Sequence, residues 1–303
     1  MRGYFQKTHR SVIAFCVDAV VIISVYYLIT AVLWGTGLLS KLVVIPLAMA
    51  LAANRWMAIG ILSHDAYHYT FHRNKKVNDF FGHLTALFIM NDFKDARRAH
   101  LAHHQHLFGE GDLDARVAHE MVRLGLNNWK LWWISPLYML RHAKRILAIY
   151  ENEPKGLWGS MRPYMMQVSL LLGLGAIDWR LGLIHFGIVY LAMAFHLARS
   201  FLEHCHMPEG VKTRSYYGGH PLLNWTLYAH NIGYHDLHHN FPGIPWYNLA
   251  KAHKDGLKST KSARHHQSGA AHADETVESL FIGGRSARAI ARRFPFVPKS
   301  PAA

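Results

Sequence analysis

The stretch SVIAFCVDAVVIISVYYLITAVLW, from Ser11 to Trp34, carries a single charged residue, Asp18. At 1.5 Å per residue, a helix of this length crosses the ~30 Å hydrocarbon core of a bilayer. It is too long for a cleavable signal peptide, and no small-residue cleavage site follows it. The stretch therefore predicts a transmembrane helix.

Three further apolar runs follow: Lys41–Leu62, Pro163–Ile177 and Leu181–Ala198. Short connections, GTGLLS at 35–40 and DWR at 178–180, couple the four runs into two pairs. A buried core helix is the alternative for any apolar helix, but two closely coupled pairs of near-spanning length favour the membrane. We expect an all-α integral membrane protein with four transmembrane helices arranged as two hairpins.

Charge predicts the orientation. The chain is 51% hydrophobic yet carries a net charge of +14, and its basic stretches lie at the N-terminus, between the hairpins and in the C-terminal part. The hairpin tips carry little charge, so the positive-inside rule places both termini and the central segment in the cytoplasm. Residues 1–253 would form the membrane domain. Residues 254–303 would form a basic tail that is disordered or lies at the membrane interface.

Histidine is the unusual residue of this chain, with 24 copies against two cysteines. Two cysteines cannot form a cysteine-based zinc site or a cysteine-ligated iron–sulfur cluster. The histidines gather in four clusters: HDAYH at 64–68, HLAHH at 100–104, EHCH at 203–206 and HDLHH at 235–239. All four fall on the same predicted side of the membrane, in a helical cytoplasmic cap beyond the spans.

The spacing of these histidines determines which rings share a helix face. Side chains three and four residues apart share a helix face, so H-x-x-x-H directs two imidazoles the same way. In H-x-x-H-H, the first and last rings lie on one face and the middle ring lies beside them. Eight histidines in three such boxes exceed the needs of one metal ion and suit two. Imidazole binds zinc, copper, iron and nickel, so the spacing alone does not identify the metal.

Three of these histidine clusters resemble those of a known family. HDAYH, HLAHHQH and YHDLHHNFPGIPWYNL are similar to the three histidine boxes of the membrane-bound fatty acid desaturase superfamily, which includes desaturases, hydroxylases and ketolases. GEGDLDA, after the second box, also looks like an acidic segment common there, and the resemblance runs from about Asn54 to Leu249. It implies a diiron centre, with two iron ions (Fe2+/Fe3+) and O2 as cofactors. The implied ligands are His64, His68, His100, His103, His104, His204, His235, His238 and His239.

The resemblance also implies outer partners of the metal. Asn231 matches an asparagine that holds a water near the metal. His106 departs from the pattern as an additional histidine in the second box, and we interpret it as a supporting residue. A ligating imidazole usually donates its other N–H to a carboxylate or carbonyl. The remaining supporting candidates are Asp65, Glu203, His230 and Asp236, and other acidic residues near the boxes include Asp92, Asp95, Asp112 and Asp114.

The implied reaction is O2-dependent desaturation of an acyl chain of a lipid or thioester, with hydroxylation or ketolation of an apolar substrate as the alternative. A separate electron donor of ferredoxin, rubredoxin or cytochrome type is implied, because the chain has no haem motif, Rossmann fingerprint or iron–sulfur cysteine set. The positive charge would attract an acidic donor or anionic lipid headgroups. Two other classes are a metal transporter, which would place ionisable groups within its spans, and a zinc hydrolase, which needs only three protein ligands.

Overall fold

A computed structural model describes residues 2–107, 109, 111–114, 116–117, 134–142, 149, 157–204, 213, 215 and 228–256. Within these ranges every regular element is a helix, which confirms the predicted all-α class for the described part of the chain. Nearly all of the predicted tail, from residue 257 onward, lies outside the described residues, as does His206 of the EHCH cluster.

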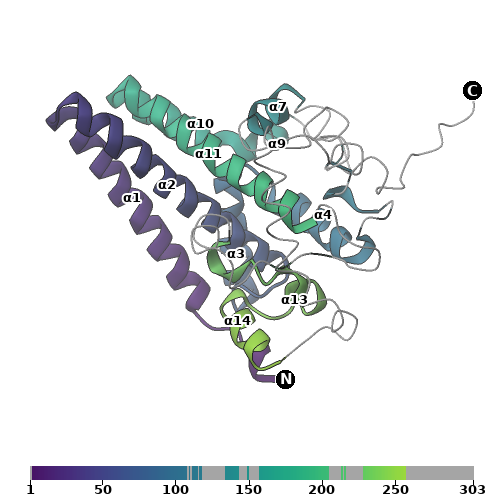
Figure 1. Ribbon diagram of the computed structural model, residues 1–303. Helices are drawn as coiled ribbons and strands as arrows, with labels where there is room; N and C mark the ends of the chain where they lie inside the picture. The colour runs from purple at the N-terminus through teal and green to yellow at the C-terminus, as the bar shows by residue number, and fades with distance from the viewer. Residues whose placement is uncertain are drawn as a thin grey trace, which may run out of the picture.

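Four helices project together from one end of the molecule (Figure 1). They are α1 (Arg10–Gly35), α2 (Leu38–Tyr67), α10 (Met165–Ile177) and α11 (Trp179–His204). The remaining elements are η1 (Arg2–Phe5), α3 (Lys75–Phe88), α4 (Phe93–His106), α7 (Ser135–Arg141), α9 (Leu157–Met161), η2 (Arg162–Tyr164), η3 (Ala229–Asn231), α13 (His235–Asn240) and α14 (Trp246–Lys254).

Among the described residues, three helices are long and apolar enough to cross a membrane: α1, α2 and the Trp179–Ser200 part of α11. The fourth expected span is not among them. The Arg162–Tyr164 segment, which contains Pro163, is a 3-10 turn, and α10 has only 13 residues. At 1.5 Å per residue α10 is about 20 Å long, shorter than the hydrocarbon core of a bilayer.

The long helices pack through a shared apolar interior and keep apolar residues on the outside. Ile29 of α1, Ala52 of α2 and Ile188 of α11 are fully buried in one cluster. Outside it, Ile23 is 67% exposed and Leu42 63% exposed. An apolar residue exposed on a long apolar helix is well placed to contact lipid, because lipid tails satisfy it and the helix satisfies its own backbone.

The α10–α11 hairpin is tight because of two glycines. A Cβ added to Gly182 would lie 3.1 Å from the Cα of Gly175 and 3.3 Å from the carbonyl oxygen of Leu171. A larger residue at 182 would separate the two helices. Small residues at such crossings let helix backbones approach closely in membranes.

The other end of the bundle carries the short helices. Figure 1 shows α3, α4, α13 and α14 gathered where α1 begins and α2 ends. Side-chain caps define where two of these helices begin: Asn74 accepts the backbone N–H of Lys76 at the start of α3, and Asp92 accepts that of Lys94 at the start of α4. Such caps satisfy backbone donors that have no partner within the helix.

Trp246 fastens the C-terminal helices to the bundle. Its indole N–H donates to Ser11 Oγ of α1 at 3.1 Å, and its backbone N–H donates to the Asp65 carboxylate of α2 at 3.3 Å. Its ring lies 4.6 Å, centroid to centroid, from that of His230, just ahead of α13. The last described segment is thereby held against the first two long helices.

Candidate metal centre

Three helices bring the histidine boxes to one place. His64 lies in the last turn of α2 and His68 caps its end, while His100, His103 and His104 lie on α4. The short helix α13 carries the remaining box, and α11 ends at His204. The expected i, i+4 spacing therefore operates on real helical faces in all three boxes.

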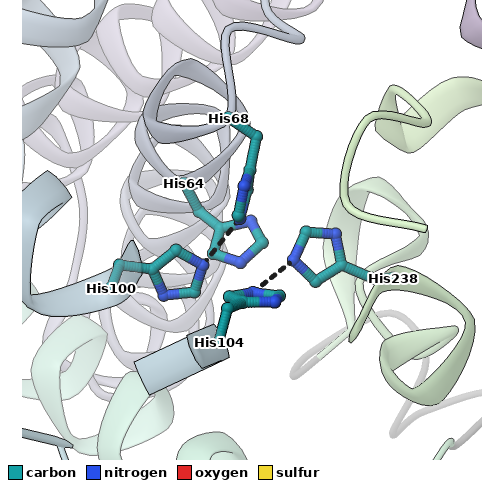
Figure 2. Close-up of side chains that lie close together, drawn as sticks. All are labelled: His64, His68, His100, His104 and His238. Atoms are coloured by element: carbon teal, nitrogen blue, oxygen red, sulfur yellow. Dashed lines mark hydrogen bonds between the residues drawn. The ribbon is translucent and has the colours of Figure 1, made fainter. Parts of the chain in front are cut away.

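Five histidines form the first histidine set: His64, His68, His100, His104 and His238. One ring nitrogen from each of these five lies within 4.8 Å of every other. Figure 2 shows the rings pointing toward one another from three separate segments. The Nε2 atoms of His68 and His100 are 2.8 Å apart, and those of His104 and His238 are 3.1 Å apart.

A second group adjoins the first. The second histidine set comprises His103, His204, His235 and His239. The Nε2 of His235 is 3.0 Å from that of His204 and 3.1 Å from that of His239. The two sets meet where the ring of His104 stacks on that of His239, with centroids 4.1 Å apart. All nine histidines expected from the sequence thus lie in one continuous cluster.

Burial keeps most of these rings neutral. The pKa of His68 falls to about 3, through burial and then the charge of Arg97. Burial and the charges of neighbouring histidines hold the pKa of His100, His238 and His239 well below 6.5. For His204 and His235 burial also comes first, with neighbouring histidines and Arg199 lowering the pKa further. A neutral imidazole is the form that binds a metal.

His103 differs from the other rings. Burial lowers its pKa, but the hydrogen bond and charge of Asp112, helped by Asp114 and Glu203, outweigh burial and raise it. The His103 Nδ1 and the Asp112 carboxylate are 3.0 Å apart, and both side chains are buried. Such a carboxylate fixes the tautomer and leaves Nε2 free to bind a metal.

Glu203 supplies a carboxylate directly beside the second set. One of its oxygens groups with the ring nitrogens of His204 and His235, and Oε2 lies 3.6 Å from His235 Nε2. Arg199, one turn earlier on α11, donates to that same oxygen. Burial raises the pKa of Glu203 to about 7, against the lowering effects of Arg199 and His103.

Metal ions fit this donor set. Both ring nitrogens of His64, Nδ1 of His235 and Oε1 of Glu203 are shielded from solvent and have no hydrogen-bond partner among the described residues. Buried polar atoms are normally paired, and an unmade interaction there is costly. Ring nitrogens that face one another across about 3 Å form an arrangement that a cation between them would satisfy. The number of rings suits two ions.

The other five candidates for outer partners of the metal, apart from Glu203, have contacts of their own. Asp65 accepts the backbone N–H of Trp246, and Asp236 accepts from Asn240 within α13. His230 pairs with Asp18 of α1 at 2.7 Å, while the Asn231 amide donates to the Trp246 carbonyl at 3.3 Å. His106 is exposed and is not a member of either set.

Sequence reasoning missed Arg199, which donates to Glu203 beside the second set, and Asp18, which contacts His230 ahead of α13. Arg199 carries the usual signal of an i, i+4 charge pair with Glu203. Asp18 is the one charge within an apolar run, and a lone charge within a span usually has a buried partner. Asp18 accepts from Arg55 of α2 at 3.2 Å as well as contacting His230.

Comparisons with known proteins agree with this geometry. The chain is 28% identical to a chloroplastic omega-3 fatty acid desaturase of Glycine max over 246 residues, which is 71% of this chain and 54% of that protein. It is 30% identical to a sphingolipid delta(4)-desaturase/C4-monooxygenase of Homo sapiens over 163 residues, 52% of this chain and 48% of that one. A fatty acid desaturase of Bacillus subtilis (strain 168) is 24% identical over 261 residues, 73% of this chain and 72% of its own.

The chain therefore spans about half the length of the plant and human relatives and more of the bacterial one. The family model described as fatty acid desaturase matches residues 40–268, which includes every histidine of both sets. On the matched model, the related proteins and the histidine cluster together, this chain belongs to the fatty acid desaturase family.

Proposed function

We propose that this protein is a membrane-bound diiron oxidoreductase that uses O2 to desaturate an acyl chain of a lipid or thioester. The observation that carries the proposal is the meeting of nine histidines in two adjoining sets beside the ends of apolar helices. A single zinc ion would leave most of these nitrogens without a role. A transport pathway would place its ligands within the spans, and these lie at or beyond the helix ends.

The first histidine set would hold one iron and the second set the other, with Glu203 beside the second. When bound, the irons supply the redox chemistry of O2, which amino-acid side chains cannot perform. The protein's own part is to present neutral imidazoles, fix their directions and exclude water. Asp112 holds His103, and Arg199 holds Glu203, so both rigid supports belong to the second set.

The reaction balances as follows. The substrate loses two hydrogen atoms from adjacent carbons to give an alkene, and O2 becomes two waters with two further electrons and two protons. The two electrons come from a separate donor of ferredoxin, rubredoxin or cytochrome type. The net positive charge of the chain suits an acidic donor.

In the membrane, we infer that α1 and α2 form one hairpin and α10 and α11 the other. The short α10 would reach only part of the way across unless the preceding segment α9–η2 extends it. Both termini and the histidine sets would face the cytoplasm, because the basic stretches lie at that end of the helices. In this orientation the sets would lie at the membrane surface, within reach of an acyl chain that rises from the bilayer.

Hydroxylation or ketolation of the substrate is the alternative reaction. Several related proteins bear the name desaturase/C4-monooxygenase, which includes both alkene formation and oxygen insertion. The two outcomes differ in the position of the substrate carbon relative to the site, while the same two histidine sets would serve both.

Two measurements test the proposal. Metal analysis of the purified chain should find two irons, and lipid mass spectrometry of cells that express it should find a product lacking two hydrogens. A product that gains one oxygen would select the hydroxylase alternative. One zinc per chain, with no lipid change, would contradict the proposal. His142→Ala is a suitable control because His142 caps α7 and belongs to neither set.

A further inference from the structure

A basic groove lies on a different face of α4 from the histidines. Helices α3 and α4, with Tyr69 from the segment after α2, line a space of about 590 Å³ that opens to the surface. From α4 the lining residues include Lys94, Arg97, Arg98 and Leu101. These positions recur at helical spacing on one face, whereas His100, His103 and His104 point elsewhere.

The charge of the groove has one dominant sign. Lys75 of α3 joins Lys94, Arg97 and Arg98 of α4, and among the described lining residues they face one carboxylate, Asp79. A concave surface lined by one sign of charge concentrates ions of the opposite sign. The groove is therefore suited to an anion.

Arg97 is held in place before any ligand arrives. Its Nε–H donates to the Tyr67 carbonyl at 2.9 Å, and its guanidinium lies 3.7 Å from the centre of the Tyr69 ring. The ammonium of Lys75 lies 5.4 Å from the same ring. One aromatic ring thus orients two cations.

Tyr69 ends α2 in the left-handed conformation, with a φ of 56°. Its N–H donates to the Ala66 carbonyl at 3.1 Å, and the N–H of Thr70 donates to the Asp65 carbonyl at 3.0 Å. This is a common way for a helix to end. The turn fixes the backbone of the residue whose ring supports Arg97.

We propose that this groove binds a phosphate ester group, with Arg97 as a fork-shaped donor and Lys75 and Lys94 as flanking charges. A planar guanidinium with a fixed orientation matches the geometry of phosphate oxygens, and charge-assisted hydrogen bonds of this kind are strong. The site stands on the groove alone and does not depend on either iron or on the proposed reaction.

The phosphate could come from a membrane phospholipid headgroup or from a soluble phosphate ester. Both present the same oxygens to Arg97. The lining also contains Phe93 and Leu101, and Leu101 is 39% exposed. An apolar surface beside the cations would add affinity only for a ligand that carries hydrocarbon.

The test measures binding to the full chain purified in a maltoside micelle, which contains no phosphate. The two probes are dihexanoylphosphatidic acid and glycerol 3-phosphate, which share a phosphate monoester and differ in their acyl chains. Calorimetry should detect binding of at least one. Tighter binding of the phosphatidic acid would identify a lipid source, and equal binding would identify a soluble one.

Arg97→Gln should weaken binding by at least about tenfold. Lys76→Gln is the matched control, because Lys76 is equally charged, exposed and on α3 but does not line the groove. Lys94→Gln, at an exposed position, should weaken binding by about threefold without affecting the fold. Arg97→Lys should give an intermediate affinity because it keeps the charge and loses the fork.

Two results would overturn the site. One is the absence of binding of either probe to the unsubstituted protein. The other is an equal effect of Arg97→Gln and Lys76→Gln, which would show attraction to general positive charge. Since iron content is measured separately on the same samples, loss of this site and failure of the diiron proposal are distinguishable.

Discussion

The histidine boxes on α4 and α13 have the same H-x-x-H-H spacing but opposite assignments. On α4 the outer two histidines belong to the first set, and the middle one, His103, joins the second. On α13 the outer two belong to the second set, and the middle one, His238, joins the first. Each box therefore contributes one ring to the set that receives two rings from the other box.

This exchange follows from helix geometry. Residues i and i+4 lie on one face, whereas the adjacent residues i+3 and i+4 project about 100° apart around the helix, so the middle and last rings of a box diverge. Each of the two helices gives two rings to one set and one ring to the other set. The two sets are therefore held next to each other by both helices. The contacts agree: His238 reaches His104 at 3.1 Å, and His104 stacks on His239.

The two boxes differ in what supports them. Helix α4 has 14 residues and a side-chain cap, and its crossing ring, His103, is held by Asp112. Helix α13 has six residues and depends on segments before and after it, through His230 and Trp246. The α4 box is thus supported locally, and the α13 box by contacts that are distant in sequence.

The largest effect should come from His104→Ala, because His104 belongs to the first set and stacks on a ring of the second. We expect the desaturated product to fall by more than the ~10–100-fold that outer contacts contribute. Iron content should fall well below two per chain. His142→Ala should retain both, and a His104→Ala protein with full iron and product would refute the joint role of this ring.

Asp112→Asn should act on one set alone. Removing the charge that orients His103 should lower the iron affinity of the second set about 10–100-fold and leave the first set loaded. Iron titration followed by Mössbauer spectroscopy can resolve the two ions. Asp255→Asn, at an exposed carboxylate that accepts from Tyr4, is the control. Equal loss from both sets would show that the support is not local.

Acidification should destabilise the iron-free protein. The pKa of His68 is about 3 in the folded chain against 6.5 ordinarily, so below pH 6.5 the unfolded chain binds more protons and stability falls. His68 alone accounts for about 2 kcal/mol between about pH 7.5 and about pH 5. His103 and Glu203, whose pKa values are raised, act in the opposite direction. They are outnumbered by further histidines whose lowered pKa values act as that of His68 does: His100, His204, His235, His238 and His239. An unfolding midpoint that stays constant or rises on acidification would contradict this balance.

The smallest effect should come from Asp18→Asn, which weakens the distant support of the α13 box. Asp18 contacts both Arg55 and His230, and asparagine keeps the shape without the charge. We expect a loss of about 1–2 kcal/mol in the free energy of unfolding. Iron should be lost from the second set first, since that set takes two rings from α13. A loss confined to the first set would reverse this interpretation.

Much of this arrangement could be predicted from local sequence. The run from Ser11 to Trp34 predicts α1 almost to the residue, and the box spacing predicts which histidines share a face. These succeed because hydrophobic length and helical periodicity are properties of contiguous residues. Apolarity alone predicts a span from Pro163 to Ile177, but it does not show that Pro163 lies in a separate 3-10 turn, Arg162–Tyr164.

The remaining features depend on contacts that no local pattern encodes. His230 and Asn231 stand beside a box, yet their side chains turn toward Asp18 and the Trp246 carbonyl. Both residues have a positive φ, and because neither is a glycine the sequence gives no sign of this conformation. The crossing of His103 and His238 between sets likewise requires two helices placed face to face.

The ties of Trp246 have a consequence for biosynthesis. Its indole bonds to Ser11, 235 residues earlier, and the box just before it supplies three of the nine rings. Chains emerge from the ribosome N-terminus first, at ~5–20 residues per second, so α1 and α2 are made well before α13. During that interval His64 and His68 exist without their partners from α13. Assembly of the histidine cluster is therefore a late event, completed when the returning C-terminal segment docks on helices already made.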